Sequence, residues 1–257
     1  MLRQTFIHLP GVGLALEQRL WAAGVRTWDD FTEADRLPLV SAQRQARLAD
    51  LIDQSRSRLD DLDYWGQRLP RSEHWRLYGR FKSRAAFLDI ETSGLSVDQG
   101  GEVSLIGLFD GCSYRPFVNG YNLDRFEMAL EKAGLVVTFN GACFDLPYLA
   151  AYFRHLRLPA IHLDLRYLLR RLGYQGGLKK IEPLFGLRRE AEVAGLDGFQ
   201  AVILWRRFLE GDRRALSLLI RYNRADTVNL MPLMDRAYQE LQRELKDPGF
   251  ESGQELQ

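Results

Sequence analysis

Residues 85–91 of the chain read AAFLDIE. Their apolar run predicts a buried strand, and the run ends in two acids, Asp89 and Glu91. Strand side chains alternate between the two faces, so residues two apart project from the same face. Two carboxylates that close together repel each other, and folding alone does not require them. A divalent cation would relieve the repulsion, and oxygen-only ligands favour Mg²⁺ or Mn²⁺. The alternative is a solvated strand end with Glu91 capping the next turn.

Strands and helices alternate along the chain after this segment. Asp110-Gly111 marks a hairpin turn, and Asn140-Gly141 marks a sharp turn after another apolar strand. From 166 to 245 the pattern is helical, with breaks at glycines. This order predicts an α/β domain with a mixed sheet flanked by helices. We expect strands over 103–109, 113–118, 135–139 and 160–165, and helices over 123–132 and 144–156.

Two more acids, Asp145 and Asp226, are candidates for the same site as Asp89 and Glu91. Asp145 lies in the first turn of a helix after the strand 135–139, where an acid also serves as an N-cap or dipole partner. In open α/β sheets, however, sites form beyond the carboxyl ends of strands. Tyr222 and Asp226 are four residues apart and share a helix face. A half-buried tyrosine beside a surface aspartate is the other interpretation.

Taken in order, the three acidic segments resemble the motifs of the DEDD superfamily of 3′–5′ exonucleases, which have an RNase H-like fold. The first motif, D-x-E, is similar to DIETSGL (89–95), and the second is similar to NGACFDLPYL (140–149), as in the proofreading exonuclease of family-B DNA polymerases. The third, in its tyrosine form, is similar to YNRADTVNL (222–230). The histidine form has a His where this chain has Arg221, so the chain resembles the DEDDy branch, and most of all its YprB-like group of stand-alone RNase H-like domains. The resemblance covers about residues 84–240.

This resemblance implies specific roles for the motif residues. Two Mg²⁺ or Mn²⁺ ions would be bound by Asp89, Glu91, Asp145 and Asp226. Tyr222 would position the attacking water and help to deprotonate it. Phosphodiester hydrolysis places charge on an attacking and a leaving oxygen, and two cations stabilise both. Contacts to the substrate's 3′ end are implied for Thr92, Leu95, Asn140 and Phe144.

The overall charge balance argues against binding nucleic acid by bulk charge. The chain has 35 Lys and Arg against 34 Asp and Glu, for a net charge of +1. Basic residues are nevertheless concentrated between 154 and 189, where Lys179 and Lys180 follow a glycine-broken loop. Such a loop suits a phosphate backbone, and we predict that both lysines bind the substrate. A solvated helix face with long arginine side chains is the alternative.

The N-terminal segment LPGVG (9–13) resembles the turn of a helix-hairpin-helix module. In such a hairpin, Gly11 and Gly13 would expose backbone N–H groups to DNA phosphates without reading sequence. A simple turn between helices, a contact with another protein, or docking on the exonuclease domain is the alternative. We therefore expect a small all-α module over 1–33, a helical connector over 34–83, an RNase H-like exonuclease domain over 84–246 and a flexible tail over 247–257.

The leading expectation is a metal-dependent 3′–5′ exonuclease acting on single-stranded ends, with DNA favoured over RNA. An exoribonuclease and a non-catalytic nucleic-acid-binding module of a repair or replication assembly are the alternatives, and a helicase or polymerase is the possible partner. The complete set of motif residues argues against the non-catalytic module.

Cys112 and Cys143 lack metal-site spacing, so we expect buried free thiols. No apolar run is long enough for a membrane span, which favours a cytoplasmic protein.

Overall fold

The structure, a computed structural model, describes residues 1–246, and the tail predicted at 247–257 lies outside the described residues. The chain divides into two compact units, Met1–Lys82 and Ser83–Gln257. Among residues 1–246, no helix combines the length and apolar character that crossing a bilayer requires.

The N-terminal unit is helical, as the sequence predicts. Thr27 caps the second helix through a capping box with Asp30, because each side chain accepts a hydrogen bond from the other's backbone N–H. The segment ahead of the hairpin Leu9–Gly13 holds a single 3-10 turn, so its helix-hairpin-helix character stays a prediction. The α-helices are α1 (Leu14–Ala22), α2 (Trp28–Glu33), α3 (Ala42–Arg56), α4 (Leu62–Arg68) and α5 (Tyr78–Phe81), and the 3-10 turns are Leu2–Gln4 and Arg71–Leu77.

Residues on both sides of position 34 share the core of this unit. The Trp28 ring stacks on the Trp65 ring with centroids 5.9 Å apart, and the His8 ring lies 5.0 Å from that of Trp65. Arg76, fully buried, pairs with Glu17 at 2.9 Å and with Glu73 at 2.8 Å. Aromatic packing and this buried ion network therefore join the first helices to the segment that follows them.

His8 makes the stability of this unit depend on pH. Burial lowers the pKa of His8 to about 3, from 6.5 when it is exposed. Because the folded pKa is the lower one, the stability that neutral His8 contributes is complete above pH 6.5 and is lost as the pH falls toward 3. We expect a loss of about 2 kcal/mol by pH 5.

Urea unfolding of the full chain, followed by tryptophan emission, measures this loss, because all tryptophans except Trp205 lie in the N-terminal unit. His8→Phe keeps an aromatic ring in contact with both Trp28 and Trp65 and cannot be protonated. The variant should therefore lose less stability than the wild type between pH 7 and pH 5. If the stability of the variant and of the wild type fell equally between pH 7 and pH 5, His8 would not be the source of the pH dependence.

The second unit is built on a five-stranded mixed sheet with the order β3-β2-β1-β4-β5. The central strand β1 pairs antiparallel with β2 and parallel with β4; β2 pairs antiparallel with β3, and β4 parallel with β5. The α/β class with a mixed sheet is thus as predicted. The strands are β1 (Ala85–Thr92), β2 (Val103–Phe109), β3 (Tyr114–Val118), β4 (Leu135–Thr138) and β5 (Ile161–Asp164).

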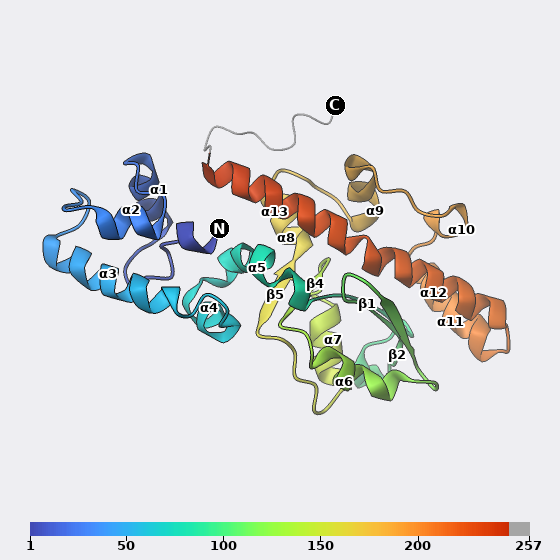
Figure 1. Ribbon diagram of the computed structural model, residues 1–257. Coiled ribbons are helices and arrows are strands. Elements are labelled where there is room, and N and C mark those ends of the chain that lie inside the picture. Colours follow the sequence, from blue (N-terminus) through green and yellow to red (C-terminus); the bar gives the residue numbers. More distant parts are fainter. Residues whose placement is uncertain (247–257) are drawn as a thin grey trace. The chain divides into compact units, whose positions relative to one another are not determined.

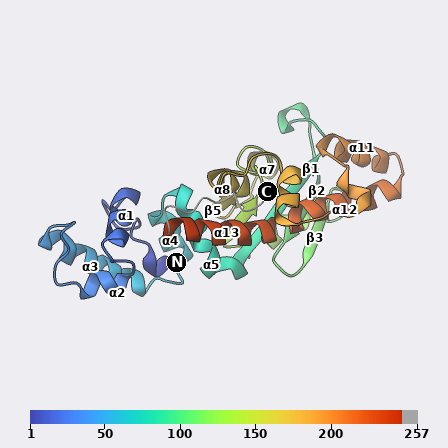
Figure 2. The same ribbon diagram turned by 90° about the horizontal axis from the view of Figure 1, so that it is seen from above.

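Helices cover both faces of this sheet (Figure 1). On one face, Phe126, Leu130 and Leu149 of α6 and α7 pack against Leu88 and Ile106 of the strands. On the other face, α11 and α12, which lie side by side in Figure 2, pack against Leu105 and Val118. The helices are α6 (Phe126–Leu130), α7 (Asp145–Tyr152), α8 (Leu165–Arg171), α9 (Leu178–Ile181), α10 (Ala191–Ala194), α11 (Gly198–Leu209), α12 (Arg213–Val228) and α13 (Leu230–Lys246).

Some boundaries differ from the predicted ones. The helix predicted at 144–156 ends at Tyr152, because Phe153 adopts extended backbone and packs its ring 5.7 Å from that of Phe126. The prediction that both cysteines are buried is wrong. Cys112 and Cys143 are exposed free thiols, since each lies in a turn, after Asp110-Gly111 and after Asn140-Gly141.

Candidate functional site

The three acids of the site come from two elements on one face of the sheet. Asp89 and Glu91 project from β1, and Asp226 projects from α12. One carboxylate oxygen from each lies within 4.8 Å of the others. Glu91 is 8% exposed and Asp226 is 6% exposed. The alternatives considered from the sequence, a solvated strand end at Glu91 and a surface position for Asp226, are therefore wrong. Three oxygen donors at this spacing fit a hard divalent cation such as Mg²⁺ or Mn²⁺.

Asp145, the fourth predicted acid, lies beside this group. It occupies the first position of α7 and is 5% exposed. Its Oδ1 accepts a hydrogen bond from the backbone N–H of Ile90, at 3.1 Å. The N-cap of α7 is Phe144, so Asp145 is not the helix cap. The turn after β4 therefore carries this carboxylate to the backbone of β1 at Ile90.

Burial and mutual repulsion dominate the electrostatics of the acids. They raise the pKa values of Asp89 and Glu91 well above their usual range. Burial raises the pKa of Asp145 to about 7, and it raises the pKa of Asp226 although Arg189 opposes that shift. A cation bound among these carboxylates would stabilise their ionised forms and lower their pKa values.

Asn223 fixes the two acids of β1, and sequence reasoning gave it no role. It is fully buried, and its Nδ2 donates to Asp89 Oδ2 at 2.9 Å and to Glu91 Oε1 at 3.5 Å. Its Oδ1 accepts from the Tyr114 hydroxyl at 2.8 Å. The signal in the sequence was its place in α12 between Tyr222 and Asp226.

Gly107 allows α12 to approach the sheet this closely. It pairs with Asp89 across β1 and β2. A Cβ at this position would lie 2.0 Å from Asn223 Oδ1 and 2.3 Å from Thr227 Oγ1. A side chain at position 107 would therefore push α12 off the strands that carry the acids.

Tyr222 and Lys179 meet beside the acids. Lys179 Nζ donates to the Tyr222 hydroxyl at 2.9 Å and lies 4.5 Å from the centre of its ring. Nζ also donates to the carbonyl of Leu196. Burial lowers the pKa of Lys179, and burial together with Asp226 and Glu91 raises the pKa of Tyr222 far above its usual value. The phenol is therefore held in its neutral form by its surroundings.

Arg189 lies inside the site, unlike the surface role predicted for its basic stretch. Its side chain is 5% exposed, and it pairs with Glu182 and with Asp226. Two buried carboxylates engage Arg189, so it is not one of the exposed cations expected of the basic stretch 154–189.

A cleft of about 1610 Å³ opens over the acids, larger than the roughly 300–1,000 Å³ of ordinary small-molecule pockets. Lys180 is exposed outside the lining, and Gly11 and Gly13 belong to the N-terminal unit. Lys179 lies outside the lining but reaches it through Tyr222. The predicted site residues that line the cleft are Asp89, Glu91, Thr92, Leu95, Asn140, Phe144, Asp145, Tyr222 and Asp226.

The turn after β4 is held by Asp164, which sequence reasoning also missed. Asp164 accepts hydrogen bonds from the backbone N–H groups of Asn140 at 2.7 Å and of Ala142 at 3.0 Å. Asn140 has a left-handed φ of 67°, and its Oδ1 accepts from Arg166 Nη1 at 2.5 Å. A buried carboxylate at the end of β5 thereby shapes the turn that delivers Asp145.

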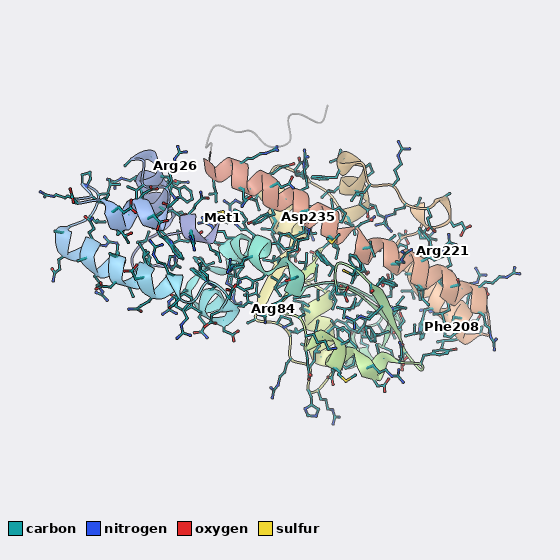
Figure 3. The ribbon with its side chains drawn as sticks, in the orientation of Figure 1. Met1, Arg26, Arg84, Phe208, Arg221 and Asp235 are labelled. Atoms are coloured by element: carbon teal, nitrogen blue, oxygen red, sulfur yellow. The ribbon has the colours of Figure 1, made fainter. Side chains whose placement is uncertain are left out.

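Arg221 occupies the position that is a histidine in the other form of the third motif. Figure 3 labels Arg221 on α12. Its side chain is 41% exposed and forms ion pairs with Glu190 and Glu192. Arg221 thus faces away from the cleft lining, and Tyr222 is the residue of this motif that reaches it.

Among solved structures, the chain is similar to the family B DNA polymerase from the hyperthermophilic archaeon Pyrobaculum calidifontis, with a TM-score of 0.52 and 16% identity. The match covers 66% of this chain and 26% of the polymerase, so the chain spans about a quarter of that protein's length. Brucella melitensis NrnC bound to pGG matches at a TM-score of 0.46 and 18% identity, over 66% of this chain and 79% of that one. The Aedes aegypti Nibbler EXO domain matches at a TM-score of 0.45 and 12% identity, over 68% of this chain and 92% of that one.

A comparison with curated proteins gave no significant match. The family model of the RNase H superfamily matches residues 86–238, which is more than half of the chain. These residues contain the sheet except for Ala85, the first residue of β1, and the 3-2-1-4-5 order of the sheet arises from the pairing described above. The chain belongs to the RNase H superfamily.

Proposed function

We propose that this protein is a metal-dependent 3′–5′ exonuclease of the DEDDy type, similar to the YprB-like group, which hydrolyses phosphodiester bonds at single-stranded 3′ ends. The observation that carries the proposal is the group of Asp89, Glu91 and Asp226, whose oxygens lie within 4.8 Å of one another under a large cleft. Folding gains nothing from this buried repulsion, whereas phosphoryl transfer with divalent cations requires such a site.

In this proposal, Asp89, Glu91 and Asp226 bind Mg²⁺ or Mn²⁺, and Asp145 completes the ligands for two ions. Bound cations would neutralise charge on the scissile phosphate and activate the attacking water. Asn223 fixes the direction of the Asp89 and Glu91 carboxylates through its amide. Such outer contacts orient the ligands of a metal and tune its affinity.

Tyr222 acts on the attacking water by orientation rather than as a free base. Its pKa is raised, so the phenol keeps its proton. Lys179 donates to the phenol oxygen, and the O–H of Tyr222 interacts with the Asp226 carboxylate. Lys179 and Asp226 thus set the direction of the phenol, and a water held by the phenol and by the carboxylates would be aligned with the phosphorus.

Replacing Tyr222 with Phe removes this hydrogen bond with little change in packing. We expect kcat to fall by about 10²–10⁴-fold, with little change in KM. Tyr167→Phe is the matched control, because that phenol is half exposed and bonds only to Cys143 among the described residues. Steady-state kinetics on a labelled oligonucleotide compare the two variants, and equal activity would exclude the tyrosine mechanism.

The lining of the cleft suits a single strand with unstacked bases. Arg166 and Arg170 of α8 provide cations for phosphates. Three apolar side chains of the lining are exposed, Leu95 at 49%, Phe144 at 46% and Phe199 at 72%. Exposed apolar and aromatic groups beside cations favour single-stranded nucleic acid. Thr92 and Asn140 are proposed to contact the terminal nucleotide, and Lys180 the backbone farther out.

DNA is the proposed substrate because of the likeness of residues 140–149 to proofreading exonucleases and of LPGVG to a DNA-binding hairpin. Gly11 and Gly13 are proposed to offer backbone N–H groups to phosphates. A role in DNA repair beside a helicase or polymerase is proposed with it. An exoribonuclease and a non-catalytic binding module are the competing functions.

The function is tested with 5′-labelled single-stranded DNA, single-stranded RNA and blunt duplex, each incubated with Mg²⁺ or Mn²⁺. We expect a ladder of single-nucleotide steps from the 3′ end of single-stranded DNA. A ladder on RNA alone would favour the exoribonuclease. Binding without cleavage of any substrate would favour the binding module.

A further inference from the structure

One arginine lies among the acids of the proposed metal site. Arg189 follows the 3-10 turn Glu182–Phe185 and precedes α10. Its Nε donates to Glu182 Oε2 at 2.6 Å and its Nη2 donates to Glu182 Oε1 at 2.8 Å. The same Nη2 also donates to Asp226 Oδ1. Within residues 1–246, its buried Nη1 has no hydrogen-bond partner.

Glu182 is itself fixed, so the guanidinium cannot easily move away. Its side chain is 2% exposed, and Oε1 accepts a second hydrogen bond, from Asn229 Nδ2 at 2.8 Å. A two-pronged arginine–carboxylate pair is geometrically rigid. Arg189 therefore presents one positive charge to Asp226 from a fixed position, and the charge is shared with Glu182.

We propose that Arg189 is an internal counter-cation that stabilises the acidic group and weakens its affinity for divalent metal. It occupies one oxygen of Asp226, and its charge repels a cation bound among Asp89, Glu91 and Asp226. Glu182 offsets part of that charge. The arginine and the glutamate thus set metal affinity in opposite directions, which a purely structural ion pair would not do. The inference rests on the metal site of the proposed function.

Calorimetric titration of the full chain with Mn²⁺ tests this role. Arg189→Met keeps the bulk of the side chain without its charge, and we expect Mn²⁺ to bind at least about tenfold more tightly. Glu182→Gln leaves the arginine charge uncompensated, and we expect binding weaker by about threefold or more. Arg221→Met is the matched control, because it removes an equal charge from an exposed ion-paired arginine on α12 and should change affinity by less than about twofold.

Thermal unfolding in EDTA adds a second readout. Arg189→Met should unfold at a lower temperature than the wild type without metal, and the difference should shrink when Mn²⁺ is added. If Arg189→Met does not fold, the Glu182→Gln variant provides the test. Mn²⁺ binding to Glu182→Gln that is as tight as in the wild type, or tighter, overturns the proposal. Wild-type binding with no gain in Arg189→Met also overturns it. Absence of Mn²⁺ binding in all variants, wild type included, would instead remove the metal site and the proposed function with it.

Discussion

Asp89→Asn is expected to abolish nuclease activity and at the same time to stabilise the metal-free protein. The carboxylate is a proposed ligand, and losing several kcal/mol of charge stabilisation lowers the rate by about 10³-fold or more. Without metal, Asp89 is destabilising, because burial and the neighbouring acids raise its pKa. Asparagine keeps an acceptor for Asn223, which donates to Asp89 Oδ2. We expect a gain of about 1–3 kcal/mol, or roughly 3–10 °C in Tm, in EDTA.

Opposite changes in activity and stability distinguish a functional acid from a structural one. Asp98→Asn is the matched control, since Asp98 is an exposed acid that lines the same cleft. It should leave both the activity and the unfolding temperature within error of the wild type. A fall in the metal-free Tm of Asp89→Asn would mean that the carboxylate stabilises the fold, and retained activity would remove it from the site.

Gly107→Ala is expected to damage the fold and the site together. The new Cβ would lie 2.0 Å from Asn223 Oδ1 and 2.3 Å from Thr227 Oγ1, so either α12 or β2 must move. Overpacking of this kind costs about 3 kcal/mol or more, a fall in Tm of roughly 6–12 °C. Because α12 carries Tyr222 and Asp226, its displacement should also remove most of the activity, even below the lowered Tm.

Calorimetric unfolding and the nuclease assay measure both effects. Gly195→Ala is the control, because Gly195 has a φ of −91° and no atom within 4 Å of its added Cβ. That variant should unfold and cleave like the wild type. A Gly107→Ala protein with normal Tm and activity would show that the close approach of α12 is not needed.

The sheet was predictable because its strands are apolar runs bounded by turn residues. The segments 85–91 and 103–109 became β1 and β2 within a residue or so of the expected ends. Asp89 and Glu91 were predictable as candidates because folding alone does not require two carboxylates so close together. Asp145 and Asp226 became candidates through the resemblance of their segments to the exonuclease motifs. The approach of Asp145 to Asp89 and Glu91 follows from the order of the strands, since β1 and β4 are parallel neighbours. Asp226 reaches them from α12, which packs on β1 and β2.

The residues that support those acids were not predictable. Asn223 and Asp164 are polar residues with ordinary spacing, and only the tertiary fold shows which backbone or carboxylate they contact. The role of Gly107 could not be predicted, because a glycine inside a strand can mark a bulge, a bend or the close approach of another backbone. Arg189 was assigned to a basic surface because sequence charge does not reveal burial, and its partner Glu182 is seven residues away in the chain.

Cleavage of linear against circular single-stranded DNA of the same sequence, in Mn²⁺, shows whether the protein requires a 3′ end. An exonuclease that requires a 3′ end should convert the linear strand to mononucleotides and leave the circle intact. Degradation of both would indicate an endonuclease. Degradation of neither, with Mn²⁺ binding established, would contradict the account.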